Sequence, residues 1–193
     1  KIEIEIPSAQ IKSGLILASL NIEGISHIIE KNTTRDHTEN MLKSFGADIN
    51  VEKKNNQTSI YIKGKQELKA NNINVPSDLS SSAFFIIAAL INKGSKINLN
   101  NININPSRDG ILKALKKMGA KINVKNQRTL SGEIVADLDV EYSNLVGCEL
   151  DAEMAKFMID EYPILSIAAA FAKGTSIFRG LKELKVKESN RLE

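Results

Sequence analysis

Three charged residues near the end of the chain have types and a spacing that could do chemistry on an anion. Lys187, Glu188 and Arg191 belong to the sequence Lys-Glu-Ser-Asn-Arg. If this segment opens a helix, Lys187 and Arg191 share one face and Glu188 lies beside them. Two cations so placed repel each other unless an anion lies between them, and the carboxylate could then move a proton on that anion. The segment predicts an enzyme that acts on an anionic substrate.

An acidic pair before an apolar segment is a second candidate. Asp160 and Glu161 directly precede the dipeptide Tyr-Pro, and residues 164–172 are almost wholly apolar. Because a helix of this kind is buried, we expect the acids at its start to face a cleft. One interpretation is that they only cap the helix. The other is that a buried acid near Lys187 has its pKa tuned for proton transfer.

Two helix starts nearer the N-terminus could bind an anion. Ser8 and Gln10 would lie beside backbone N–H groups, which suits a phosphate or hydroxyl ligand, although Ser8 could simply cap its helix. Arg35 and Asp36 share the predicted first turn of another helix. Asp36 suits the positive end of the helix dipole, whereas Arg35 opposes it unless it holds an anion there. The alternative is that Asp36 caps the helix and Arg35 points to solvent.

Similar residues recur further along the chain, and this repetition favours a structural role for them. Arg108 and Asp109 repeat Arg35 and Asp36 at a distance of 73 residues, and Gly119 follows Gly46 at the same distance. Such strict register indicates an internal duplication. We expect the serines at 80–82 to be small packing residues, because no histidine stands where it could activate them.

The duplicated unit predicts the order β-α-β-α-β-β. Ser8 or Asp78 heads a first helix, and Gly46 or Gly119 suits the left-handed position after the second. The strands are predicted at residues 26–30, 48–54 and 59–63 of the first copy and at 95–99, 121–125 and 133–135 of the second. A third copy begins at Asp160, with a strand at 175–179, and stops where its second helix starts. The fold class is α/β (α+β), with a linker predicted between residues 65 and 76.

Composition narrows the classes of function. The chain is 42% hydrophobic and 25% charged, and its net charge of +3 falls short of a dedicated nucleic-acid binder. Cys148 is the single cysteine and there are two histidines, which argues against a disulfide framework and a structural metal site. No apolar run is long enough to span a membrane. Since no Walker loop, dinucleotide fingerprint or nucleophile elbow is present, no cofactor is indicated.

Four segments together resemble the EPSP synthase (3-phosphoshikimate 1-carboxyvinyltransferase) family. They are residues 7–13 (Pro-Ser-Ala-Gln-Ile-Lys-Ser), 34–39 (Thr-Arg-Asp-His-Thr-Glu), 159–165 (Ile-Asp-Glu-Tyr-Pro-Ile-Leu) and 185–191 (Lys-Val-Lys-Glu-Ser-Asn-Arg). The Ser-Ala-Gln and Asp-Glu-Tyr-Pro sequences are most similar to the glyphosate-insensitive bacterial class. The resemblance covers essentially the whole chain in order and spacing.

The resemblance implies an incomplete fold of the enolpyruvyl transferase inside-out barrel type. Enzymes of this family have two domains, each built from three β-α-β-α-β-β units, with the active site in the cleft between them. Residues 1–72 would then be the last unit of one domain. Residues 73–193 would be one complete and one truncated unit of the second. The family's remaining active-site lysines and arginines fall outside this chain, which is therefore expected to be a poor catalyst or none when alone.

The resemblance also implies a reaction and its substrates. The enolpyruvyl group of phosphoenolpyruvate passes to the 5-hydroxyl of shikimate 3-phosphate, and phosphate leaves, through a tetrahedral intermediate and without a cofactor or metal. This is a step of aromatic amino acid biosynthesis by a cytoplasmic enzyme, monomeric at full length, with no nucleic-acid or membrane partner. Two polyanionic substrates require cations and helix N-termini, and addition to an enol ether requires paired acids and bases.

Roles carry over to matching positions only as implications of the resemblance. Ser8, Ala9 and Gln10 would contact shikimate 3-phosphate, with Gln10 also near phosphoenolpyruvate, and Arg35 would join the anion-binding set. Asp160 would accept the 5-hydroxyl proton and Lys187 would contact the substrates. Glu188 would protonate the methylene carbon and Arg191 would hold the phosphoenolpyruvate anion. Asn190 departs from the family's usual aspartate, which bears on local capping more than on catalysis.

Two other functions remain open from the sequence. The sister enolpyruvyl transferase acting on UDP-N-acetylglucosamine shares the fold and phosphoenolpyruvate, but its usual cysteine nucleophile lies elsewhere, and the segment 187–191 favours the shikimate enzyme. A non-catalytic anion- or RNA-binding module is the other, because RNA-processing cyclases use related β-α-β-α-β-β units. Salt-dependent RNA binding without any response to shikimate 3-phosphate would support it.

Overall fold

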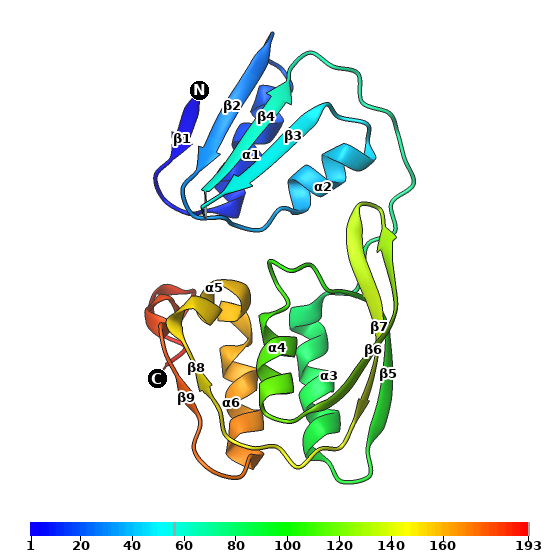
Figure 1. Cartoon of the computed structure of the whole chain (residues 1–193), viewed down its shortest axis with the longest axis vertical. Helices are drawn as coiled ribbons and strands as arrows, with labels where there is room; N and C mark the ends of the chain where they lie inside the picture. The colour runs from blue at the N-terminus through cyan, green and yellow to red at the C-terminus, as the bar shows by residue number, and fades with distance from the viewer. Residues whose placement is uncertain (56, 193) are drawn as a thin grey trace. The chain divides into compact units, whose positions relative to one another are not determined.

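The computed structural model describes residues 1–55 and 57–192, which form two compact units (Figure 1). Unit 1 consists of Lys1–Val75 together with Leu130–Glu133. Unit 2 consists of Pro76–Thr129 and the residues from Ile134 on. None of the helices in the described part of the chain is long and apolar enough to cross a membrane.

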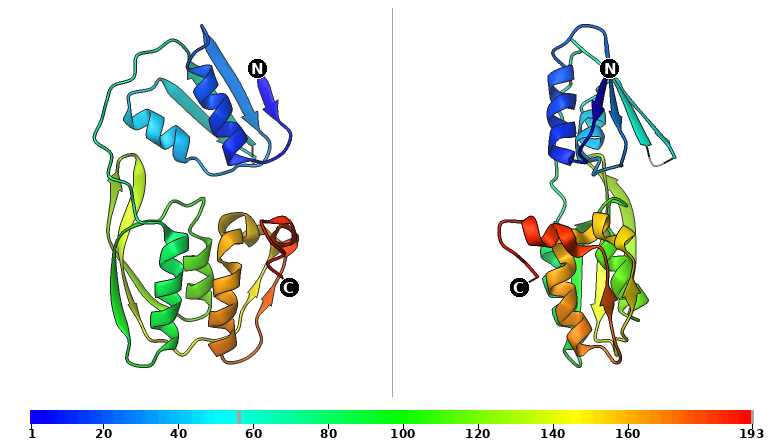
Figure 2. Two further views of the ribbon diagram at one scale, coloured as in Figure 1. Left: turned by 180° about the vertical axis from the view of Figure 1, so that it is seen from behind. Right: turned by 90° about the vertical axis from the view of Figure 1, so that its left-hand side faces the viewer.

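Unit 1 contains the first copy of the repeat, and its elements follow the predicted order. They are β1 (Ile2–Ile4), α1 (Ala9–Ser19), β2 (Ile25–Glu30), α2 (His37–Ser44), β3 (Ile49–Lys54) and β4 (Gln57–Lys63). The sheet order is β1-β2-β4-β3, with β1 parallel to β2 and the other pairs antiparallel. Ile16 of α1 and Leu42 of α2 pack with Ile28, Ile60 and Ile62 from the strands in one apolar core. Burial of these side chains fixes which face of the sheet the helices cover (Figure 2).

Unit 2 contains the second copy and the beginning of the third. The second copy is α3 (Leu79–Ile91), β5 (Lys96–Asn103), α4 (Gly110–Lys117), β6 (Lys121–Leu130) and β7 (Glu133–Glu141), with sheet order β5-β7-β6. In the described residues its opening strand is reduced to one parallel bridge, Ser77 with Ile102. Strands β6 and β7 are longer than the predicted strands at 121–125 and 133–135. They continue as a hairpin through residues that lack a clear apolar pattern. Gly132 at the turn has φ +85°, a conformation suited to glycine.

The third copy starts earlier than predicted. Its elements are β8 (Glu149–Leu150), η1 (Ala152–Met154), α5 (Ala155–Met158), η2 (Ile159–Glu161), α6 (Tyr162–Phe171), β9 (Ile177–Phe178) and η3 (Leu181–Val186). The prediction that the copy begins at Asp160 is therefore wrong, since β8 precedes it and pairs in parallel with β9. Two residues are too short a strand to leave a recognisable alternation in sequence.

The two second helices end in the same way, as the repeat predicts. Gly46 and Gly119 have φ of +78° and +84°. The N–H of Gly46 donates to Lys43 O at 3.0 Å, and the N–H of Gly119 donates to Lys116 O at 3.0 Å. In each copy the next residue's N–H reaches back to a leucine carbonyl, Leu42 or Leu115, at 3.0 Å. These paired bonds satisfy the last carbonyls of each helix in a Schellman motif.

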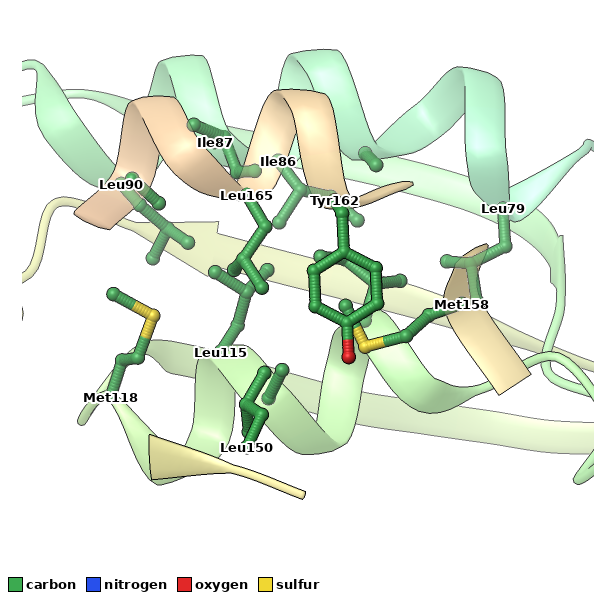
Figure 3. Close-up of a cluster of buried hydrophobic side chains, with 14 of the residues drawn as sticks. Leu79, Ile86, Ile87, Leu90, Leu115, Met118, Leu150, Met158, Tyr162 and Leu165 are labelled. Atoms are coloured by element: carbon green, nitrogen blue, oxygen red, sulfur yellow. The ribbon is translucent and has the colours of Figure 1, made fainter. Parts of the chain in front are cut away.

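The core of unit 2 lies between its three longer helices and the β5-β7-β6 sheet. Helices α3 and α6 contribute Ile86, Leu90, Tyr162 and Leu165, all less than 3% exposed (Figure 3). Leu115 of α4 closes the cluster from the other side. The sequence of α6 is almost wholly apolar, but the expectation that the helix is buried is wrong, because Ile167 and Phe171 are 45% and 64% exposed. The packed face of α6 holds its first residue, Tyr162, next to Asp160.

Candidate functional site

Unit 2 brings Asp160, Lys187 and Arg191 together. Asp160 Oδ1 lies 3.4 Å from Arg191 Nη1 and 3.7 Å from Lys187 Nζ. All three side chains are partly exposed, with relative accessibilities of 32%, 24% and 27% for Asp160, Lys187 and Arg191. A carboxylate between two cations, with one side open to solvent, is suited to binding an anionic group and exchanging a proton with it.

Packing of two short segments brings these residues together. Asp160 belongs to η2, which leads directly into α6, where Pro163 suits the first turn. The other segment is η3, which Leu184 anchors in the core of unit 2 at 1% exposure. The backbone N–H of Arg191 donates to Leu184 O at 3.0 Å, so the chain turns back over η3. The buried leucine therefore controls where Arg191 is presented.

The prediction that Lys187 opens a helix is wrong. Helix η3 ends at Val186, Lys187 is extended with ψ −166°, and the described residues 187–192 form bends and a turn. Lys187 and Arg191 converge on Asp160 because the chain reverses, and a shared helix face plays no part.

Both cations also contact carboxylates of their own segment. Lys187 Nζ lies 2.7 Å from Glu183 Oε1, and this hydrogen bond is the main reason why the pKa of Lys187 is raised. Arg191 Nη2 lies 2.5 Å from Glu188 Oε2, and that bond lowers the pKa of the Glu188 carboxyl. Glu188 is therefore held as a carboxylate while it pairs with Arg191. A change of partner at Arg191 would favour protonation of Glu188.

Unit 1 places the remaining candidates at the starts of two helices. Ser8 is the N-cap of α1, where its Oγ accepts from the Ile11 N–H at 3.3 Å, and it also donates to Gln10 Oε1 at 3.3 Å. Ser8 and Ala9 are half-buried and Gln10 is exposed. Arg35 is half-buried and precedes α2, so the expectation that it lies in the first helical turn is wrong. Asp36 takes the N-cap position, and its carboxylate contacts Lys53 Nζ at 3.2 Å.

A buried ion cluster, Lys12–Glu30–Glu39, supports both of these helix starts. Lys12 Nζ lies 2.9 Å from Glu39 Oε1 and 3.3 Å from Glu30 Oε2, and all three residues are 1% exposed. Glu30 Oε1 accepts the backbone N–H of Thr34 at 2.9 Å. The cluster thus connects the first turns of α1 to the loop that carries Arg35. The sequence does hold a signal for this cluster, because Lys12 lies on the same face of α1 as the buried residues Ile16 and Ser19.

The sequence of this chain is similar to that of a known enzyme family over its whole length. The family model for EPSP synthase (3-phosphoshikimate 1-carboxyvinyltransferase) matches residues 1–193. The chain is 49% identical over 190 residues to the 3-phosphoshikimate 1-carboxyvinyltransferase of Cereibacter sphaeroides, covering 98% of this chain and 43% of that protein. This chain belongs to the EPSP synthase family. The protein of the same name from Mesorhizobium japonicum is 48% identical over 98% of this chain and 42% of its own length.

Solved structures agree with the family and with its fold. EPSP synthase from Acinetobacter baumannii superposes with a TM-score of 0.90 at 43% identity, covering 98% of this chain and 42% of that one. The enolpyruvyl transferase NikO from Streptomyces tendae has a TM-score of 0.60 at 19% identity over 86% of this chain and 39% of that one, which shows a shared fold. The chain thus spans less than half the length of the EPSP synthases it matches, and its α/β fold is a partial one of the enolpyruvyl transferase type.

Proposed function

We propose that this chain is part of an enzyme that transfers the enolpyruvyl group of phosphoenolpyruvate to the 5-hydroxyl of shikimate 3-phosphate. The observation that carries the proposal is the convergence of Lys187 and Arg191 on Asp160, with Glu188 bound to Arg191. Names of the relatives support the same reaction. Residues 1–72 would supply the last unit of one domain, and residues 73–193 one complete and one truncated unit of the other.

In the proposed mechanism Asp160 removes the proton of the 5-hydroxyl as its oxygen attacks C2 of phosphoenolpyruvate. Lys187 contacts the substrates and Arg191 holds the phosphoenolpyruvate anion. When Arg191 turns to that anion, it no longer lowers the pKa of Glu188, so the carboxylate takes up a proton from solvent more readily. The protonated Glu188 then delivers this proton to the methylene carbon. Loss of a proton from the resulting methyl group and of phosphate from C2 then restores the double bond in the product.

The unit 1 candidates would bind the phosphorylated acceptor. Ser8, Ala9 and Gln10 lie at the N-terminus of α1, where free backbone N–H groups favour an anion or a hydroxyl. Arg35 would add a positive charge to this set. The buried Lys12–Glu30–Glu39 cluster supports the assignment, because it fixes the loop before Arg35 relative to α1.

Three finer properties are part of the proposal. The Ser-Ala-Gln sequence at 8–10 and the Asp-Glu-Tyr-Pro sequence at 160–163 favour the glyphosate-insensitive class. The enzyme would act in the cytoplasm as part of aromatic amino acid biosynthesis. It would be a monomer at full length, without nucleic-acid or membrane partners. Steady-state inhibition by glyphosate and the mass of the full-length protein in solution test the first and third.

An acceptor panel tests the proposed reaction. The full-length protein that contains this chain is incubated with phosphoenolpyruvate and either shikimate 3-phosphate or UDP-N-acetylglucosamine, and phosphate release is followed. Release that depends on shikimate 3-phosphate alone supports the proposal. Release with the UDP-sugar alone would assign the sister reaction. Salt-dependent RNA binding with no release in either mixture would indicate the binding module.

A further inference from the structure

A second cluster of charges lies deeper in unit 2 and centres on Arg108. Its guanidinium Nη2 lies 3.5 Å from Asp78 Oδ1 and 3.9 Å from Glu161 Oε1, and it donates to Ser80 Oγ. Ser80 in turn donates its hydroxyl proton to Glu161 Oε1. Glu161 is 4% exposed and the side chain of Arg108 is 22% exposed. The expectation that Ser80 only fills space is wrong, because it bridges an arginine and a buried glutamate.

The four members of this cluster stand at the starts of three helices. Asp78 caps α3 and Ser80 lies in its first turn, Arg108 comes shortly before α4, and Glu161 is the N-cap of α6. The three helices begin at the same end of unit 2 (Figure 1). Arg108 is the counterpart of Arg35 in the repeat. Its guanidinium contacts two carboxylates and a serine hydroxyl of unit 2. Its role is therefore to brace the helix starts.

Glu161 directly follows Asp160 in η2, and the two side chains point to different partners. Successive residues of a 3-10 helix are about 120° apart, so a short helix can present one side chain to the interior and its neighbour to a cleft. Glu161 reaches Ser80 and Arg108 inside unit 2, while Asp160 reaches Lys187 and Arg191. Holding the Glu161 side chain thus fixes the backbone that carries Asp160.

We propose that Glu161, braced by Ser80 and Arg108, is the positioning residue that orients Asp160 toward Lys187 and Arg191. The inference rests on the proposed function, because Glu161 can position a catalytic group only if Asp160 has the catalytic role proposed for it. Burying a carboxylate is costly even when it is paired, and a neutral side chain of the same shape would pack as well. Glu161 therefore serves orientation more than stability, through the oxygen that accepts the Ser80 hydroxyl.

Turnover of the full-length protein tests this inference. Replacing Glu161→Ala should lower kcat by roughly 10- to 100-fold, the cost of a catalytic group displaced by about 1 Å. KM for both substrates should stay within about threefold, since the binding residues remain. Glu161→Gln keeps an oxygen for the Ser80 hydroxyl and should recover most of kcat. Glu149→Ala is the matched control, because Glu149 pairs with Arg179 at 2.6 Å on the surface of the same unit.

A double-variant cycle separates positioning from general destabilisation. In an Asp160→Asn background, Glu161→Ala should lower kcat by less than about twofold, because the group that it positions has already lost its function. Equal fold-losses in both backgrounds, or full kcat in Glu161→Ala, would overturn the inference. Ser80→Ala, which removes only a hydroxyl, replaces Glu161→Ala if that variant does not fold, and it should show the same non-additivity. Undiminished turnover in Asp160→Asn alone would instead refute the proposed function.

Discussion

Removal of the buried cation of unit 1 gives the sharpest test of how its helix starts are held. In Lys12→Met, Glu30 and Glu39 stay buried at 1% exposure without the ammonium group that now lies within 3.3 Å of both. Breaking a buried ion pair by removing one partner costs about 3–5 kcal/mol, because the other charge is left without compensation. A domain of this size loses roughly 4–8 °C of Tm per kcal/mol, so we expect a fall of about 12–40 °C in unit 1.

Urea denaturation at neutral pH, followed by circular dichroism, measures this change. Hydrogen exchange adds a local observable, since the Thr34 N–H donates to Glu30 Oε1 at 2.9 Å and should lose protection. The matched control is Lys31→Met in the same unit. Lys31 is half exposed and its partners Glu3 and Glu5 lie on the surface, so its loss should cost less than about 1 kcal/mol.

A second substitution checks the physical cause. Glu39→Gln introduced into Lys12→Met removes one of the two uncompensated charges, so it should recover about 1–3 kcal/mol. In the wild-type background the same change should destabilise, because it takes away a partner of Lys12. The reasoning would be refuted if the effects of Lys12→Met and Glu39→Gln simply added. It would also be refuted if Lys12→Met lay within about 1 kcal/mol of wild type, the range of an exposed ion pair.

Three further predictions concern unit 2. Asp137 accepts hydrogen bonds from the Asn101 N–H, Asn126 and Arg128, which lower its pKa to about 2. The stability that this shift contributes is complete above the unfolded pKa of about 3.9 and is lost as the pH falls toward 2. Acid denaturation of Asp137→Asn should therefore lack this loss of stability. Leu165 is fully buried between helices, so Leu165→Ala should cost about 2–5 kcal/mol in urea unfolding. Gly119→Ala should cost about 1–2 kcal/mol by the same assay, because the φ of Gly119 is +84° and a side chain is strained in that conformation.

Much of the fold could be predicted because the repeat places strong local signals at fixed intervals. Glycines after the second helices, Ser8 and Asp78 at the starts of the first helices, and apolar periodicity each depend on nearby residues alone. Strand β8 and the single bridge at Ser77 could not be predicted in this way. They are too short to carry a pattern, and only pairing with a distant segment defines them.

The residues of the candidate site also differ in how far the sequence alone could identify them. Asp160, Lys187 and Arg191 could be selected by residue type, and the structure brings them together, but the expected reason was a helix that does not form there. Glu161 and Lys12 were not recognised as supports. Their roles depend on burial and on partners 81 and 18 residues away in sequence, which no local window contains.

Turnover of Glu188→Gln in the full-length protein tests the central claim most directly. Phosphate release from phosphoenolpyruvate in the presence of shikimate 3-phosphate should fall by about 10²–10⁴-fold, the usual contribution of a general acid. The affinity for shikimate 3-phosphate, measured by calorimetry, should stay near that of wild type. Glu153→Gln, at a surface pair with Lys156, is the control and should retain full turnover. Near-normal turnover in Glu188→Gln would contradict the account by removing Glu188 from the mechanism.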